Sequence, residues 1–264
     1  MTIEKIEKYF WYAVLVILGI KFLNHELFHQ LLLTPNINQN PDLAFRMFRF
    51  SGIHSIILRP PLITILLDGI LICTALFNVL GKPGKWSSLF FLIAFLIYFL
   101  LYNSLMQFTE HKLIPLLFFP WLSIISSQEN KLWLLKYLRF YFFFIFFSAA
   151  LWKIFRLNWL DVDYFKHVLL LHFDVLPLPF QTNWAQKIIE IPYLPAIIYI
   201  AGILFEISFG IGFLTKKYDA VFVFMLILFI VLDYLFMQIN FYEYFIWILV
   251  LLPFRSEENL KILK

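Results

Sequence analysis

The chain has 264 residues, of which 62% are hydrophobic and only 14% are charged, and its formal net charge is +4. This apolar excess is too large to be buried in the core of a soluble protein of this length, so a soluble globular fold is excluded. The single cysteine, Cys73, excludes an intrachain disulfide and any multi-cysteine metal or redox site.

Apolar runs of about twenty residues, the length that crosses the hydrocarbon core of a bilayer, recur along nearly the whole chain. We therefore predict an all-α polytopic integral membrane protein with about eight transmembrane helices. The predicted spans are residues 9–24, 62–80, 87–108, 112–127, 134–155, 194–214, 218–237 and 240–253. No hydrophilic linker or repeat interrupts them, so residues 1–264 are predicted to form a single transmembrane domain.

The positions of the basic residues predict the orientation, because cytoplasmic loops of membrane proteins are enriched in lysine and arginine. With the N-terminus inside, every cytoplasmic segment is basic. These segments contain Lys5, Lys8, Lys82, Lys85, Lys131, Lys136, Lys216, Lys217, Arg255, Lys261 and Lys264. We predict a protein of the bacterial inner membrane with both termini in the cytoplasm.

Two long connections, residues 25–61 and 156–193, lie on the outer side in this topology. Partly apolar helical patterns at 42–57 and 184–191 predict interfacial or re-entrant helices that cap the bundle there. All six histidines fall at or beyond the outer membrane surface: His25, His29, His54, His111, His167 and His172. A functional centre is therefore expected to face outward.

Ionisable residues within transmembrane spans are costly and are functional candidates by default. Here they are Asp68, Lys153, Glu206 and Asp233. Each carboxyl group has a structural alternative, which is to join helices through hydrogen bonds. Lys153 lies near the outer end of its span, where desolvation would favour a neutral amine that can accept a proton. Its alternative is to extend toward the nearby membrane surface.

Two short patches resemble those of a known family. Residues 149–153 read Ala-Ala-Leu-Trp-Lys and are followed by Trp159, while His111 follows Glu110 at the start of the fourth span. These patches are similar to the Ala-Gly-Leu-Lys-Lys stretch with its following tryptophan, and to the Asn-His pair, of the HTTM (horizontally transferred transmembrane) domain proteins. The vitamin K-dependent gamma-carboxylases are the best-known members of that family.

The resemblance implies that a reduced quinone binds near Lys153, which helps to deprotonate it, and that His111 hydrogen-bonds the quinone oxygen. It places Trp152, Trp159 and Glu110 beside this cofactor. In that chemistry, oxygenation of the hydroquinone yields a strong base that removes a proton next to a carboxylate, and carbon dioxide then adds to the carbanion. The chain departs from the family pattern at Trp152, where the family has a lysine, and at Glu110, where it prefers asparagine.

A second constellation, His25-Glu26-Leu27-Phe28-His29, matches the H-E-x-x-H pattern. On a helix both imidazoles would share one face and bind zinc, with Glu26 as the general base. A third ligand is needed, and Asp68 is the candidate because Leu67-Asp68-Gly69 resembles a motif of intramembrane site-2 proteases. Their active site opens toward the cytoplasm, opposite to the topology predicted here. The simpler interpretation is an interfacial amphipathic segment with coincidental spacing.

Our leading hypothesis is an HTTM-type membrane protein with an outward-facing pocket for a quinone-like or lipid-like ligand, where His111 and Lys153 meet and carboxylase-like or epoxidase-like chemistry takes place. The first alternative is a non-enzymatic subunit or assembly factor, in which Lys153 pairs with Glu206 or Asp233 and the bundle binds a membrane or extracytoplasmic protein. The second is a zinc membrane peptidase. The basic residues follow the membrane topology, so no nucleic-acid partner is expected.

Overall fold

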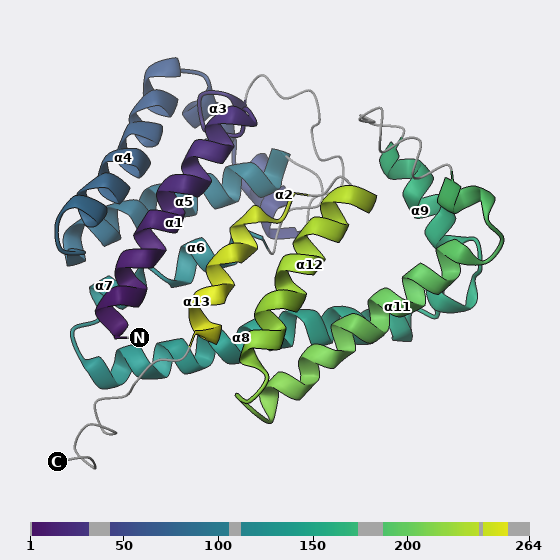
Figure 1. Cartoon of the computed structure of the whole chain (residues 1–264). Helices are drawn as coiled ribbons and strands as arrows, with labels where there is room; N and C mark the ends of the chain where they lie inside the picture. Colours follow the sequence, from purple (N-terminus) through teal and green to yellow (C-terminus); the bar gives the residue numbers. More distant parts are fainter. Residues whose placement is uncertain (1, 32–42, 106–111, 174–186, 238–239, 253–264) are drawn as a thin grey trace, which may run out of the picture. The chain divides into compact units, whose positions relative to one another are not determined.

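Figure 1 shows the computed structural model of the chain, which describes residues 2–31, 43–105, 112–173, 187–237 and 240–252. Every regular element within these residues is a helix. The described residues before Leu135 form one compact unit, here the first unit, and Leu135–Leu252 form the second unit.

The helices of the first unit are α1 (Ile3–Leu23), α2 (Leu43–Phe50), α3 (Ile53–Leu58), α4 (Pro61–Leu80), α5 (Lys85–Leu105), α6 (Ile114–Phe118) and α7 (Trp121–Ile124). Helix α8 (Gln128–Phe155) begins in the first unit and continues into the second. The second unit continues with η2 (Asn158–Leu160), α9 (Tyr164–Phe173), α11 (Leu194–Ser208), η3 (Phe209–Phe213), α12 (Asp219–Met237), η4 (Tyr242–Trp247) and α13 (Ile248–Leu251).

Four described segments are long and apolar enough to cross a membrane: Pro61–Leu80, Lys85–Ser104, Gln128–Phe155 and Leu194–Phe213. At 1.5 Å per residue, even the segments of 20 residues extend over about 30 Å, which is the thickness of the hydrocarbon core. The prediction of an all-helical membrane protein is therefore confirmed, and four predicted spans coincide with these segments.

The remaining predicted spans are helical in different ways. Helix α12 follows the prediction at 218–237 closely. Helix α1 covers most of the prediction at 9–24 but begins six residues earlier, at Ile3. The span predicted at 112–127 is instead two short helices, α6 and α7, because Pro120 has no amide hydrogen to continue the first one. The span predicted at 240–253 consists of η4 followed by the four-residue helix α13. The count of eight spans, their orientation and the single domain stay predictions.

The predicted interfacial segments are also helical where they are described. Residues 42–57 correspond to α2 and α3, which are separated at Gly52, a residue with a positive φ of 73°. Such a backbone conformation is readily adopted by glycine. In the second segment residues 187–190 are helical, and the buried Ile188 packs against Leu169 of α9.

A ladder of aromatic rings forms the core of the first unit, in which α4 packs against both α1 and α5 (Figure 1). Phe91, Phe95, Tyr98 and Tyr102 recur every three or four residues and so share one face of α5. Successive ring centroids lie 5.5, 5.5 and 5.3 Å apart. Such close ring packing matters in a bilayer, where lipid tails are as apolar as the helices themselves.

The core of the second unit is built where α8 meets η3. The stacked rings of Phe146 and Phe209 lie with their centroids 4.3 Å apart. Gly212 allows the backbone of η3 to lie close to α8, since a Cβ atom added there would clash with the ring of Phe143. Glycine thus brings the backbone of η3 against the α8 phenylalanines.

Candidate functional site

Lys153 lies in the last turn of α8 and forms an ion pair with Glu206 of α11. Its Nζ donates to Glu206 Oε1 over 2.5 Å. The lysine side chain is 35% exposed, whereas that of Glu206 is 8% exposed. The other carboxylate oxygen, Glu206 Oε2, is buried and accepts no hydrogen bond. One oxygen of this carboxylate therefore has a hydrogen-bond donor, and the other has none.

Three further side chains lie within electrostatic range of this pair. Asp233 of α12 interacts electrostatically with both Lys153 and Glu206. Tyr199 and Tyr244 also interact electrostatically with Glu206. We call these five residues the Lys153 cluster: Lys153, Tyr199, Glu206, Asp233 and Tyr244. It joins α8, α11, α12 and η4 within the second unit.

Sequence analysis singled out Lys153, Glu206 and Asp233, and its first alternative paired Lys153 with Glu206 or Asp233. The structure contains the Lys153–Glu206 pair. The two tyrosines were missed. Tyr199 could have been found, because it precedes Glu206 by seven residues and so lies on the same face of α11 two turns away. No pattern in the sequence connects Tyr244 with α8 or α11.

The two tryptophans that the resemblance places beside a cofactor have local contacts. Trp152 is 59% exposed, and the guanidinium of Arg156 lies 4.6 Å from its ring centroid. Trp159 is 38% exposed and donates its indole N–H to the backbone oxygen of Ile154 over 3.2 Å. Because neighbouring residues on a helix point about 100° apart, Trp152 and Lys153 face different directions.

His111 and Glu110 lie outside the described residues. The meeting of His111 with Lys153 and the role of Glu110 beside a cofactor therefore stay predictions.

The H-E-x-x-H segment does not form the helix that a zinc site of this kind requires. It follows α1 as a series of turns, and His25 has a positive φ of 59°. Glu26 Oε2 accepts a hydrogen bond from Lys21 Nζ over 3.0 Å. Lys21 is fully buried, and its Nζ lies 4.7 Å from the ring centroid of Tyr102. Glu26 is thus engaged by a lysine and is not placed to activate a zinc-bound water.

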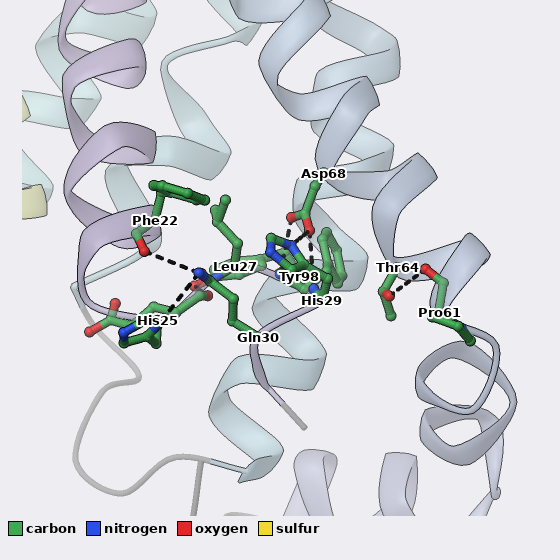
Figure 2. A network of polar contacts seen from close by, with 11 residues as sticks. Phe22, His25, Leu27, His29, Gln30, Pro61, Thr64, Asp68 and Tyr98 are labelled. Atoms are coloured by element: carbon green, nitrogen blue, oxygen red, sulfur yellow. Dashed lines mark hydrogen bonds and ion pairs between the residues drawn. The ribbon is translucent and has the colours of Figure 1, made fainter. Parts of the chain in front are cut away.

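His29 and Asp68 form the centre of the polar network in Figure 2. Asp68 Oδ1 accepts the backbone N–H of Phe28, and Oδ2 accepts the backbone N–H of His29, both over 3.0 Å. The His29 ring nitrogen Nδ1 lies 2.7 Å from the same Oδ2. An ionised carboxylate only accepts hydrogen bonds, so Nδ1 is the donor in this contact when Asp68 is ionised. Asp68, the proposed third zinc ligand, therefore stabilises the turn that contains Phe28 and His29.

Gln30 completes this network. Its side-chain oxygen accepts the backbone N–H of Leu27 over 3.1 Å, and its Nε2 donates to the carbonyl of Phe22 over 3.1 Å (Figure 2). Among the residues that the structure describes, no group of three or more histidine, cysteine, aspartate or glutamate side chains is placed to hold a metal ion. The geometry of this segment gives the zinc hypothesis no support.

Comparison of the chain with protein families, with curated proteins and with solved structures finds no match. The resemblance to HTTM proteins accordingly stays a prediction that rests on the two short patches.

Proposed function

We propose that this chain is an HTTM-type membrane protein whose Lys153 cluster binds the polar head of a quinone-like or lipid-like ligand. The observation that carries the proposal is the half-satisfied Glu206 carboxylate beside a partly exposed lysine. A buried acceptor without a donor destabilises a protein by about 1 to 3 kcal/mol, so such a group needs an explanation, and the one proposed here is a donor on a ligand.

The chemistry of the cluster suits a ligand with both a hydroxyl and an oxygen acceptor. Glu206 Oε2 is free to accept an O–H group, and the exposed part of Lys153 can donate to an oxygen atom. A hydroquinone or a lipid head group offers both functions on an apolar body, which the surrounding hydrophobic helices would accommodate. These complementary groups favour a hydroxyl-bearing amphiphile.

The finer part of the proposal is carboxylase-like or epoxidase-like chemistry with a reduced quinone. The quinone would supply the oxygen-dependent steps when bound. Lys153 would help to deprotonate the hydroquinone, and the ammonium group formed in this way would stabilise the negative charge on the quinone oxygen. His111 is the second proposed contact to the quinone oxygen. Both roles rest on the resemblance.

The ligand can be tested by mass spectrometry of small molecules that co-purify with the solubilised protein. We expect a quinone with the wild type and a reduction of about tenfold or more with Lys153→Met and with Glu206→Gln, since each removes a charged hydrogen-bonding group. Lys187→Gln is the matched control, because Lys187 is exposed and lies outside the cluster. Equal quinone content in all four proteins would exclude the Lys153 cluster as the site.

The predicted membrane and orientation form part of the same proposal, namely an inner-membrane protein with cytoplasmic termini and an outward-facing site. A single change, Cys73→Ser, removes all cysteine from the chain. Cysteines introduced at Pro83 and Asp163 should then react with an impermeant thiol reagent from the cytoplasmic and the outer side, respectively. Labelling of both from the same side would overturn the topology.

A second candidate, a non-enzymatic membrane subunit or assembly factor, is favoured by the Lys153–Glu206 pair itself. The pair gives the lysine a structural partner that joins two helices. In that case a Lys153→Met, Glu206→Gln double variant should retain its protein partners on purification. Loss of a small ligand without loss of partners would favour the first candidate.

A further inference from the structure

The polar network of the first unit leaves one ring nitrogen of His29 accessible. Its Nδ1 lies 2.7 Å from Asp68 Oδ2 (Figure 2). Among the described residues the other nitrogen, Nε2, has no hydrogen-bond partner, and it is not a buried atom. The His29 side chain is 37% exposed, whereas that of Asp68 is buried. The Asp68–His29 pair therefore has a buried carboxylate at one end and an accessible nitrogen at the other.

The backbone around His29 is held without any contribution from the imidazole ring. Asp68 accepts the backbone N–H groups of Phe28 and His29, both over 3.0 Å. On the other side, the hydroxyl of Tyr98 donates to the carbonyl oxygen of Glu26 over 2.8 Å. These bonds fix the turn and the position of the carboxylate together. The contact between the ring and Asp68 is an additional one, and it fixes the orientation of the imidazole.

The other ionisable side chains of this segment have different contacts. Glu26 Oε2 accepts from Lys21 Nζ over 3.0 Å, and His25 Nδ1 lies 3.4 Å from Gln30 Nε2. Among the described residues, Asp68 is thus the charged group in contact with the His29 ring. The chemistry of this ring is set by a single carboxylate.

The Asp68 contact determines what Nε2 can do. In its ionised form the carboxylate accepts from both backbone N–H groups and from Nδ1, so Nδ1 keeps its hydrogen. The hydrogen bond made by one ring nitrogen fixes the role of the other, and Nε2 is then an acceptor. If Nε2 takes up a proton, the positive imidazolium lies against the carboxylate, which stabilises it.

We propose that His29 is a proton-accepting site for a weakly acidic hydroxyl group, such as that of a phenol, and that Asp68 is its positioning residue. The O–H bond of the ligand breaks, the proton bonds to Nε2, and the electron pair stays on the ligand oxygen. Asp68 itself takes up no proton. A weakly acidic hydroxyl suits this role because a proton moves most efficiently between groups of similar acidity. The site lies in the first unit and does not rest on the proposed function.

Nuclear magnetic resonance of the ¹⁵N-labelled imidazoles tests this in the solubilised protein, with the His29 signals assigned by their absence from His29→Gln. At neutral pH, Nδ1 should be protonated and Nε2 unprotonated. Phenol should move the Nε2 signal toward its protonated position. Anisole, which has the same ring without a hydroxyl, should not move it. His167 is the internal control, because it is exposed and lies outside the network.

The role of Asp68 is tested by the same titration. Phenol should bind about tenfold or more weakly to Asp68→Asn, since the variant lacks the charge that stabilises the imidazolium. Both ring nitrogens of its His29 should then carry the hydrogen in part. Equal effects of phenol and anisole, equal shifts at His167, or a wild type in which Nε2 already carries the hydrogen would overturn the proposal. If Asp68→Asn does not fold, the wild-type titrations decide.

A metal ion is the other common partner of an imidazole held by a carboxylate. Zinc bound in a 1:1 ratio by the wild type and lost in His29→Gln would identify Nε2 as a metal ligand and overturn the proposal. The Lys153→Met variant should respond to phenol at His29 as the wild type does. Loss of a quinone from that variant, or absence of a quinone altogether, therefore bears on the proposed function and leaves this test intact.

Discussion

Asp68 and Glu206 are two equally buried acids with different surroundings. Both lie in segments long enough to cross a membrane, and they are 5% and 6% exposed. Both oxygens of Asp68 accept hydrogen bonds, from two backbone N–H groups and one imidazole. Glu206 has one oxygen paired with Lys153 and the other without a donor. Asp68 therefore stabilises the turn that contains Phe28 and His29, whereas Glu206 retains one oxygen that could accept a hydrogen bond from a ligand.

The physical reason for this difference is the structure of the neighbouring backbone. Asp68 faces the turns that follow α1, where amide groups have no helical carbonyl to bind and need another acceptor. Glu206 faces residues on α8 and α12, whose backbone amides already donate within their helices. The interior of a helix has no free backbone N–H groups to donate to such an acid, so its hydrogen bonds must come from side chains. For Glu206 the donor is the side chain of Lys153.

The largest effect is expected from removing the acid of the first network. Asp68→Ala leaves two backbone amides and one imidazole without their acceptor, and should lower the free energy of unfolding by about 3 kcal/mol or more. Thermal unfolding in detergent measures this. Asp68→Asn, which retains one oxygen acceptor, should lose less. Equal stability of Asp68→Ala and the wild type would end the structural interpretation of this network.

The next effect concerns packing in the second unit, which we expect to depend on its aromatic core more than on its charges. Gly212→Ala places a methyl group against Phe143 and should cost about 1 to 3 kcal/mol of stability. Gly202→Ala on α11 is the control, because nothing lies within 4 Å of the added atom. Alanine is the better helix former, so this variant should be as stable as the wild type or slightly more stable. Equal destabilisation by both would contradict the prediction.

A double-mutant cycle measures the Lys153–Glu206 pair itself. Each single variant, Lys153→Met or Glu206→Gln, leaves one charged partner behind, whereas the double variant removes both charges. We expect a coupling free energy of about 1 to 2 kcal/mol and a double variant close to wild-type stability. A coupling free energy of zero in thermal unfolding would mean that the two side chains do not interact.

The smallest effect on stability is expected at Trp152. Its ring is mostly exposed, so Trp152→Leu should change the free energy of unfolding by less than about 0.5 kcal/mol. The resemblance nevertheless predicts a contact with the cofactor. Loss of co-purifying quinone from Trp152→Leu at unchanged stability would support that contact. Retention of the quinone would show that Trp152 does not contribute to its binding.

Much of the fold could be predicted from the sequence, because a span is a local property of some twenty consecutive apolar residues. The prediction at 62–80 therefore differs by only one residue from α4. The span at 112–127 was harder, since Pro120 divides an apolar run that hydropathy alone treats as continuous. The H-E-x-x-H spacing suggested a helix, but the segment turns at His25, where the backbone takes a positive φ.

The sequence by itself determined that the chain is a helical membrane protein and which residues are costly to bury there, because both follow from composition and from runs of neighbouring residues. Only the tertiary structure decided the partners of those residues. Lys153 and Glu206 are 53 residues apart, and Asp68 is 39 residues from His29. Such pairs depend on how helices pack side by side, and spacing along a single chain does not encode that arrangement.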